Sequence, residues 1–92
     1  MPPKPPRDDH FVTLIFVING EDVEIKVNVN EPLAAARDQA LAKSHNTGRP
    51  PNEWEVRDSN GVVLPVEQKI KEFHFENGTK LFLTLKVGAG GV

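Results

Sequence analysis

The chain of 92 residues contains no cysteine, and this absence removes several classes of protein from consideration. Without thiols it has no disulfide scaffold, no zinc site held by cysteine ligands and no thiol nucleophile. This composition is compatible with the cytoplasm, where we expect the protein to reside. Its histidines are dispersed without metal-ligand spacing, at His10, His45 and His74. The sequence therefore predicts no metal site and no cofactor.

The chain also lacks an excess of basic residues and a long hydrophobic run. Its formal net charge is −2, whereas a nucleic-acid-binding domain normally has a basic face. The apolar run from Phe11 to Ile18 is far shorter than the roughly 20 residues that a membrane-spanning helix needs. Two aspartates stand beside the cations that precede this run, which makes it a poor signal peptide. We therefore expect neither nucleic acid nor membrane among its partners.

Composition divides the chain into three segments. Residues 1–10 are rich in proline and charge, and we interpret them as a flexible arm, with a polyproline binding peptide as the alternative. Residues 11–87 carry the apolar patterns of one folded domain. Residues 88–92, Gly-Ala-Gly-Gly-Val, have little side chain with which to pack and are expected to form a flexible tail.

The folded segment opens with a predicted β-hairpin. Residues Phe11 to Ile18 are β-branched, aromatic or aliphatic and favour a strand. Asn19-Gly20 is the strongest short hairpin signal, because a type I′ turn needs positive φ at both central residues. The next strand alternates strictly and should bury one face, formed by Val23, Ile25, Val27 and Val29.

A helix is expected next. Asn30 is a candidate N-cap, with Pro32 in the first turn. An apolar stripe at helical spacing is formed by Leu33, Ala36, Ala40 and Leu41. The solvent-exposed face of this helix should carry Arg37, Asp38 and Lys43. Gly48 is the expected stop, before the Pro50-Pro51 pair.

Two more strand regions and a short helical turn complete the pattern. Residues 53–57 alternate, with Trp54 and Val56 inward, and a short strand over 62–64 follows the turn at 58–61. A helical turn within 66–73 should place Ile70 and Phe73 against the core. The final strand, residues 80–87, should bury Leu81, Leu83 and Leu85. A helix between strand pairs must cross one face of a mixed sheet. The order predicts an α+β fold of the β-grasp type, with four or five strands and one main helix.

Alternation also predicts which side chains face away from the helix. Phe82 and Thr84 should point outward from the last strand, and Ile15 and Val17 should lie on the less buried face of the first. Together they would form a modest apolar patch, the usual mark of a partner surface. Glu55 on the neighbouring strand would interrupt it. No catalytic triad or carboxylate pair is placed convincingly, so we expect no enzymatic activity.

In this order and in its ending, the chain resembles ubiquitin and its relatives from Phe11 to Gly91. The shared features are the glycine-containing hairpin turn, the single helix, the proline pair before the third strand and the diglycine Gly90-Gly91. Residues 70–87 align with ubiquitin without a gap. Within this group the chain resembles the bacterial ubiquitin-like modifiers that are encoded beside activating-enzyme, conjugating-enzyme and JAB-type peptidase genes. A role in antiviral defence is what that resemblance suggests.

The resemblance implies that the chain is an acyl substrate and that the catalytic groups lie on its partners. An activating enzyme would adenylate Gly91 with ATP and pass it to a cysteine as a thioester, which an amine on a target protein would attack. Val92 would first be removed by cleavage after Gly91, for which a JAB-type peptidase is the natural candidate. Glycine suits this chemistry because it lacks Cβ and threads a narrow channel.

Two other functions share this pattern. A sulfur carrier has the same fold and diglycine, but ends in a thiocarboxylate and usually stops at the second glycine, so Val92 counts against it. An interaction domain that merely folds like ubiquitin would have a dispensable tail. The conjugated modifier is the leading hypothesis.

Overall fold

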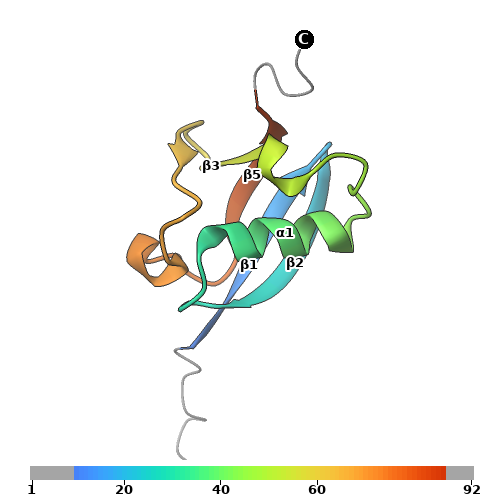
Figure 1. Cartoon of the computed structure of the whole chain (residues 1–92). Coiled ribbons are helices and arrows are strands. Elements are labelled where there is room, and N and C mark those ends of the chain that lie inside the picture. The colour runs from blue at the N-terminus through green and yellow to red at the C-terminus, as the bar shows by residue number, and fades with distance from the viewer. Residues whose placement is uncertain (1–9, 87–92) are drawn as a thin grey trace, which may run out of the picture.

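The computed structural model describes residues 10–86, and the segments predicted to be the arm and the tail lie largely outside them. Figure 1 shows a sheet crossed by one long helix. The elements in chain order are β1 (Phe11–Ile18), β2 (Glu21–Asn28), α1 (Leu33–Lys43), the 3₁₀ helix η1 (Pro51–Glu53), β3 (Trp54–Arg57), β4 (Val63–Leu64), the 3₁₀ helix η2 (Ile70–Phe73) and β5 (Thr79–Leu85).

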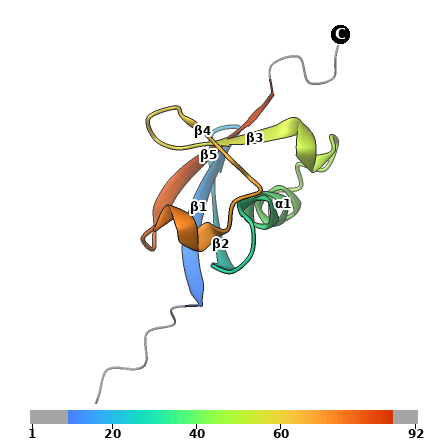
Figure 2. The same ribbon diagram turned by 60° about the vertical axis from the view of Figure 1, so that its left-hand side comes forward.

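The five strands form one mixed sheet in the order β2-β1-β5-β3-β4. β1 and β5 are parallel and lie side by side in the middle, and the other neighbouring pairs are antiparallel. Figure 2 shows α1 on one side of this sheet. The predicted α+β fold of the β-grasp type is confirmed, with five strands and one α-helix among the described residues.

The core lies between α1 and the inner face of the sheet. The predicted helical stripe is buried, with Leu33, Ala36, Ala40 and Leu41 at most 2% exposed. It faces alternate residues of the strands, which are also buried: Val12, Leu14, Phe16, Ile18, Val23, Ile25, Val27, Trp54, Val56, Leu81 and Leu83. Small alanines on the stripe let the helix sit close to the sheet. The buried residues of the strands, which recur every two residues, and those of the helix, which recur every 3.6, therefore form one apolar layer.

The Asn19-Gly20 turn has the backbone that the sequence predicts. Its φ angles are 52° and 83°, both in the left-handed region that a type I′ hairpin requires. The turn fixes Ile18 opposite Glu21, and this register continues to Phe11 opposite Asn28. Local chemistry thus sets the pairing of the whole hairpin.

Both predicted ends of the helix were wrong. α1 begins at Leu33, and Pro32 before it is extended rather than part of the first turn. The first helical donors are satisfied from a distant segment, since Leu33 N–H donates to Gln68 O and Ala34 N–H to Val66 O. The capping role expected of Asn30 is therefore filled by the chain before η2.

The helix also ends five residues before Gly48. His45 takes the left-handed conformation, with φ of 61°. Its N–H donates to Ala42 O, and the N–H of Asn46 donates to Leu41 O at 2.8 Å. These two bonds form a Schellman motif, which usually has glycine at the left-handed position. Because histidine and not glycine stands at this position, the sequence did not predict that the helix ends there.

Two side chains differ from their prediction in burial. Arg37, expected to face solvent, is only 7% exposed, and its Nε donates to Asp38 Oδ1 at 2.9 Å. Leu85, expected in the core, is 40% exposed. It shares the inner face with Trp54, but this is the last pair of the ladder, at the end of the sheet.

Candidate functional site

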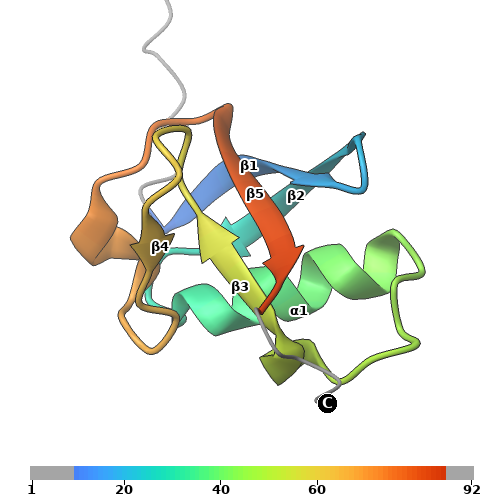
Figure 3. The ribbon, with the colours of Figure 1, turned by 90° about the horizontal axis from the view of Figure 1, so that it is seen from above.

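The parallel register of β1 and β5 brings three of the predicted surface residues together on the outer face of the sheet. Val17 lies opposite Phe82, and Ile15 lies opposite Lys80 on the same face. All three apolar side chains are half-buried, so they are partly covered and partly open to a partner. We call Ile15, Val17 and Phe82 the apolar strip. It crosses the two central strands, which Figure 3 shows side by side.

The antiparallel register of β3 and β5 extends this face. Phe82 lies opposite Arg57, and the exposed Thr84 lies opposite Glu55. Arg57 in turn lies opposite Val63 of β4, whose side chain is 50% exposed. Val63 was not predicted, because three apolar residues in a row at 62–64 do not reveal which one faces outward. The pairing with Arg57 decides it.

Two ion pairs share the outer face with the apolar strip. Lys80 Nζ on β5 lies 3.4 Å from Asp22 Oδ2 on β2, so this pair crosses β1, the strand that carries Ile15 and Val17. Beyond Phe82, on β3, Arg57 Nε donates to Glu55 Oε2 at 2.6 Å, and its Nη1 donates to Gly61 O at 3.2 Å. The Glu55 side chain is only 13% exposed. Glu55 does interrupt the patch, as predicted, but as a covered and paired carboxylate.

Phe11 adds an aromatic ring at the far end of the outer face. It is 40% exposed and lies opposite Asn28 at the start of β1. The ammonium of Lys26 sits 5.2 Å from its ring centroid, within the range of a cation–π interaction. The exposed faces of β1 and β2 are thus apolar on one strand and charged on the other.

The end of β5 fixes where the chain leaves the domain. β5 ends at Leu85, and the N–H of Lys86 donates to Glu53 O at 2.8 Å, which ties the exit point to η1. The predicted reactive residues Gly90 and Gly91, and the processing position Val92, lie outside the described residues. The structure therefore places the root of the tail and leaves those residues as predictions.

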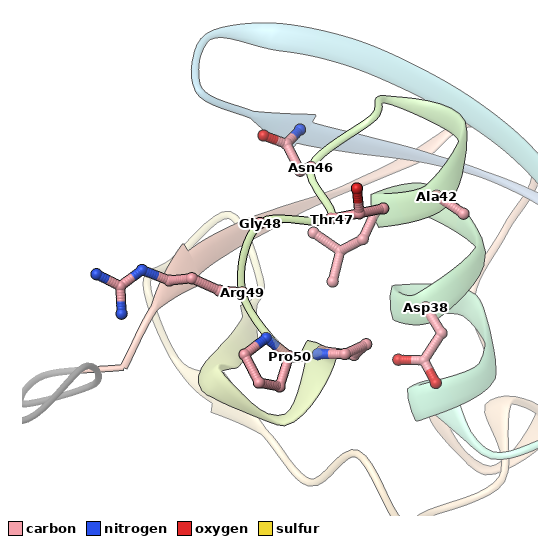
Figure 4. A pocket seen from close by; sticks show the side chains of 9 residues that line it. Asp38, Ala42, Asn46, Thr47, Gly48, Arg49 and Pro50 are labelled. Carbon is pink, nitrogen blue, oxygen red and sulfur yellow. The ribbon is translucent and has the colours of Figure 1, made fainter.

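A hollow of about 420 Å³ lies between α1 and the loop that follows it. Figure 4 shows Asp38 and Ala42 of the helix on one side and Asn46 to Pro50 on the other. Leu41, 2% exposed, also lines it. Pro51 also lines the hollow and is the first residue of η1. The last residue of η1, Glu53, accepts the hydrogen bond from the N–H of Lys86. The hollow is thus close in the structure to the exit of the chain.

The loop that lines this hollow is held by side-chain hydrogen bonds. Asn46 Nδ2 donates to Ser44 Oγ at 2.7 Å, and Asn46 Oδ1 accepts from Asn19 Nδ2 at 3.2 Å. Further along, Arg49 Nη1 donates to Glu53 Oε1 at 3.1 Å. The loop is therefore fastened both to the β1–β2 hairpin and to η1, so the hollow is preformed.

Residues 10–86 contain no group of three or more histidine, aspartate or glutamate side chains arranged to hold a metal ion. They also contain no helix both long and apolar enough to cross a bilayer. Trp54 is buried in the core as predicted, at 6% exposed. Its Nε1 is the one buried side-chain nitrogen or oxygen of this part of the chain that finds no hydrogen-bond partner.

Comparisons with known proteins agree with this architecture. The chain is similar over its backbone to a ubiquitin from Caldiarchaeum subterraneum, with TM-score 0.68, 19% identity and coverage of 83% of this chain and 94% of that one. It is similar to a designed protein based on ubiquitin, with TM-score 0.72, 17% identity and coverage of 90% and 98%. A third structure, titled "Molecular Mimicry of SUMO promotes DNA repair", matches with TM-score 0.70, 12% identity and coverage of 83% and 92%. At these identities the likeness shows the fold.

Sequence comparison gives the family. The uncharacterized protein y4jI of Sinorhizobium fredii is 38% identical over 80 residues, which are 87% of this chain and 62% of that protein. The chain thus spans less than two thirds of the length of this curated relative. The model of one family matches residues 7–91. The chain therefore belongs to the family described as "Protein of Unknown function (DUF2604)", and its fold is that of a ubiquitin-like protein.

Proposed function

We propose that this protein is a ubiquitin-like modifier that is joined to amines on target proteins through the carboxylate of Gly91. The observation that supports the proposal is the point at which the chain leaves the folded domain. The central strand β5 ends at Leu85, the bond from Lys86 N–H to Glu53 O is the last anchor of the described part, and the diglycine follows four residues later. The five residues 87–91 can span at most about 17 Å, enough to carry the last glycine away from the domain surface.

The match to the family supports the same proposal. It runs from residue 7 to residue 91, so Gly90 and Gly91 fall inside the region that the family model describes and Val92 falls outside it. Cleavage after Gly91, for which a JAB-type peptidase is the candidate enzyme, would release Val92 and free the glycine carboxylate. The bare Cα of glycine then offers no side chain to obstruct a narrow active site.

The chemistry proceeds by one adenylation and three acyl transfers on enzymes other than this chain. The Gly91 carboxylate attacks the α-phosphate of ATP, which forms an acyl adenylate and releases pyrophosphate. A cysteine thiolate of the activating enzyme attacks the Gly91 carbonyl, which forms a thioester and releases AMP. After transfer to a cysteine of the conjugating enzyme, a lysine amine attacks the thioester, which forms an isopeptide bond and releases the thiolate. The chain supplies the acyl group and the surfaces that the enzymes recognise.

Two surfaces are candidates for that recognition. The apolar strip, with Thr84 beside it, offers half-buried apolar side chains next to two ion pairs, a mixture that suits a transient enzyme contact. The hollow between α1 and its following loop lies beside the root of the tail and is preformed. An enzyme that holds the tail would be within reach of both.

Intact-mass analysis of the full chain, co-expressed with its neighbouring genes, tests the proposal. We expect loss of one valine and the appearance of higher-mass adducts. The adducts should vanish in Gly91→Ala. The matched control is Ser59→Ala, since Ser59 is exposed in the turn between β3 and β4 and belongs to neither candidate surface. Adducts that persist in Gly91→Ala, or that Ser59→Ala abolishes equally, would contradict the proposal.

The same measurement separates the two alternatives. A sulfur carrier would gain one sulfur in place of one oxygen and would form no isopeptide adduct. A ubiquitin-like interaction domain would keep its mass, and removal of residues 88–92 would leave its binding intact. The apolar strip fits this last alternative as well as it fits a modifier, because both need a partner surface on the sheet.

A further inference from the structure

Among residues 10–86, no strand pairs with the outer side of β2. β2 is eight residues long and lies at one end of the sheet, next to β1 only. The two-residue turn makes Ile18 and Glu21 a hydrogen-bonded pair, so the odd-numbered residues of β2 bond to β1. The bond from Val29 N–H to His10 O, at 2.8 Å, continues this parity. The backbone groups of Asp22, Glu24, Lys26 and Asn28 therefore point away from the sheet.

The carbonyl oxygens on that free side are occupied by donors from the helix and its approach. Lys43 Nζ donates to Glu24 O at 2.5 Å, and Gln39 Nε2 donates to Lys26 O at 3.4 Å. Gln39 and Lys43 are four residues apart on α1, so both project from the same face of the helix. The N–H of Glu31 donates to Asn28 O at 3.1 Å. Three successive outward carbonyls of an open edge are thus covered by the chain itself.

Covering the carbonyl oxygens of β2 protects this edge from pairing with other strands. An open edge strand is a template for pairing with another strand, and proteins protect long edges with charged side chains or with neighbouring elements. The exposed side chains of β2 alternate with its buried ones, so an added strand would extend both faces of the sheet. Gln39 and Lys43 are both exposed, and they can move away from the edge without disturbing the core.

The sequence of β2 is complementary to itself in one antiparallel register. If a second copy pairs edge to edge with Ile25 opposite Ile25 of the second copy, then Glu24 lies opposite Lys26 of the second copy, and Lys26 lies opposite its Glu24. Two opposite-charge pairs then form on the outer face, where such cross-strand pairs stabilise a sheet. All four of these residues have outward backbone groups, so the register also satisfies the hydrogen-bonding parity.

We propose that the free edge of β2 is a self-association edge for a second copy of this chain, kept closed in the monomer by the side chains of Gln39 and Lys43. The closed form is the one in the structure. Removal of the two donors leaves the carbonyls of Glu24 and Lys26 open to the N–H groups of another β2. The product is a two-fold dimer with a continuous ten-stranded sheet.

Sedimentation of the full-length chain tests the proposal. The wild type should remain monomeric, whereas the double variant Gln39→Ala/Lys43→Ala should associate at least about tenfold more tightly. The matched control is Gln68→Ala/Lys69→Ala, which removes the same two side-chain types from the turn before η2. Thermal unfolding of each variant monitors folding. A double variant that is folded and stays monomeric at the highest soluble concentration would overturn the proposal.

Charge reversal then tests the register. In the Gln39→Ala/Lys43→Ala background, Glu24→Lys should place like charges opposite each other and return the protein to monomer. Adding Lys26→Glu to that variant should restore the dimer, because the opposite-charge pairs reappear with reversed signs. Association that ignores both changes would show a different contact and would overturn the proposed edge.

Discussion

Neighbouring residues of β1 and β5 point to opposite faces of the sheet and have different roles. Phe16 and Leu81 face the helix and are 0% and 1% exposed, whereas Val17 and Phe82, the next residue on each strand, face outward and are half-buried. The inner pair holds the helix against the sheet. The outer pair forms most of the apolar strip, next to two ion pairs. A step of one residue, half of the side-chain period of a strand, therefore separates residues needed for folding from residues available for recognition.

The strongest way to break this comparison is to truncate one aromatic ring on each face. Phe16→Ala should lower the free energy of unfolding by about 3–5 kcal/mol, because it leaves a cavity under α1. Phe82→Ala removes a half-buried ring and should cost only about 1 kcal/mol, yet under the proposed function it should slow conjugation of the chain. Denaturant unfolding and conjugation rates measure the two effects. Equal losses of stability would mean that the outer face is part of the core.

The two ion pairs of the outer face sharpen the comparison next. Arg57→Ala leaves the covered Glu55 carboxylate without its partner. A charged group that loses its hydrogen bond in a covered position should cost about 1–3 kcal/mol of stability. Chemical denaturation measures it, with the double variant Arg57→Ala/Glu55→Ala as the control that removes the stranded charge. A double variant less stable than the single one would contradict this account.

The smallest effect is expected at Lys80. Its pair with Asp22 is 54% and 56% exposed, and such solvated pairs contribute about 0.2–1 kcal/mol. Lys80→Ala should therefore change the unfolding free energy by less than about 0.5 kcal/mol, and the change should shrink further at high salt. Unfolding curves at low and high ionic strength give the answer. A larger, salt-insensitive loss would place Lys80 among the structural residues of the sheet.

Features set by neighbouring residues could be read from the sequence, and features set by distant ones could not. Asn19-Gly20 and the alternation after it gave the hairpin register, and the stripe from Leu33 to Leu41 gave the buried side of α1. The start of α1 depends on bonds from residues 66–68, and its end depends on His45 accepting a conformation that glycine usually takes. The first signal comes from distant residues. The second is local, but it depends on a residue type that seldom takes this conformation.

The candidate surface shows the same division. Outward positions on β1 and β5 follow from alternation alone, so Ile15, Val17, Phe82 and Thr84 were predicted to be outward. The cover that Arg57 gives Glu55, and the place of Val63, depend on the pairing of β3 with both of its neighbours. Strand registers of this kind are fixed by long-range packing. The roles of Gly90, Gly91 and Val92 remain predictions from sequence.

The central position of β5 has a mechanical consequence. A force applied to the C-terminal end of the chain pulls along β5, which is bonded to β1 on one side and to β3 on the other. Because β1 and β5 are parallel, tension between the two ends of the chain loads their hydrogen bonds together in shear instead of peeling them one at a time. A machine that drags this domain by its tail would meet its greatest resistance at the outset, before any strand separates.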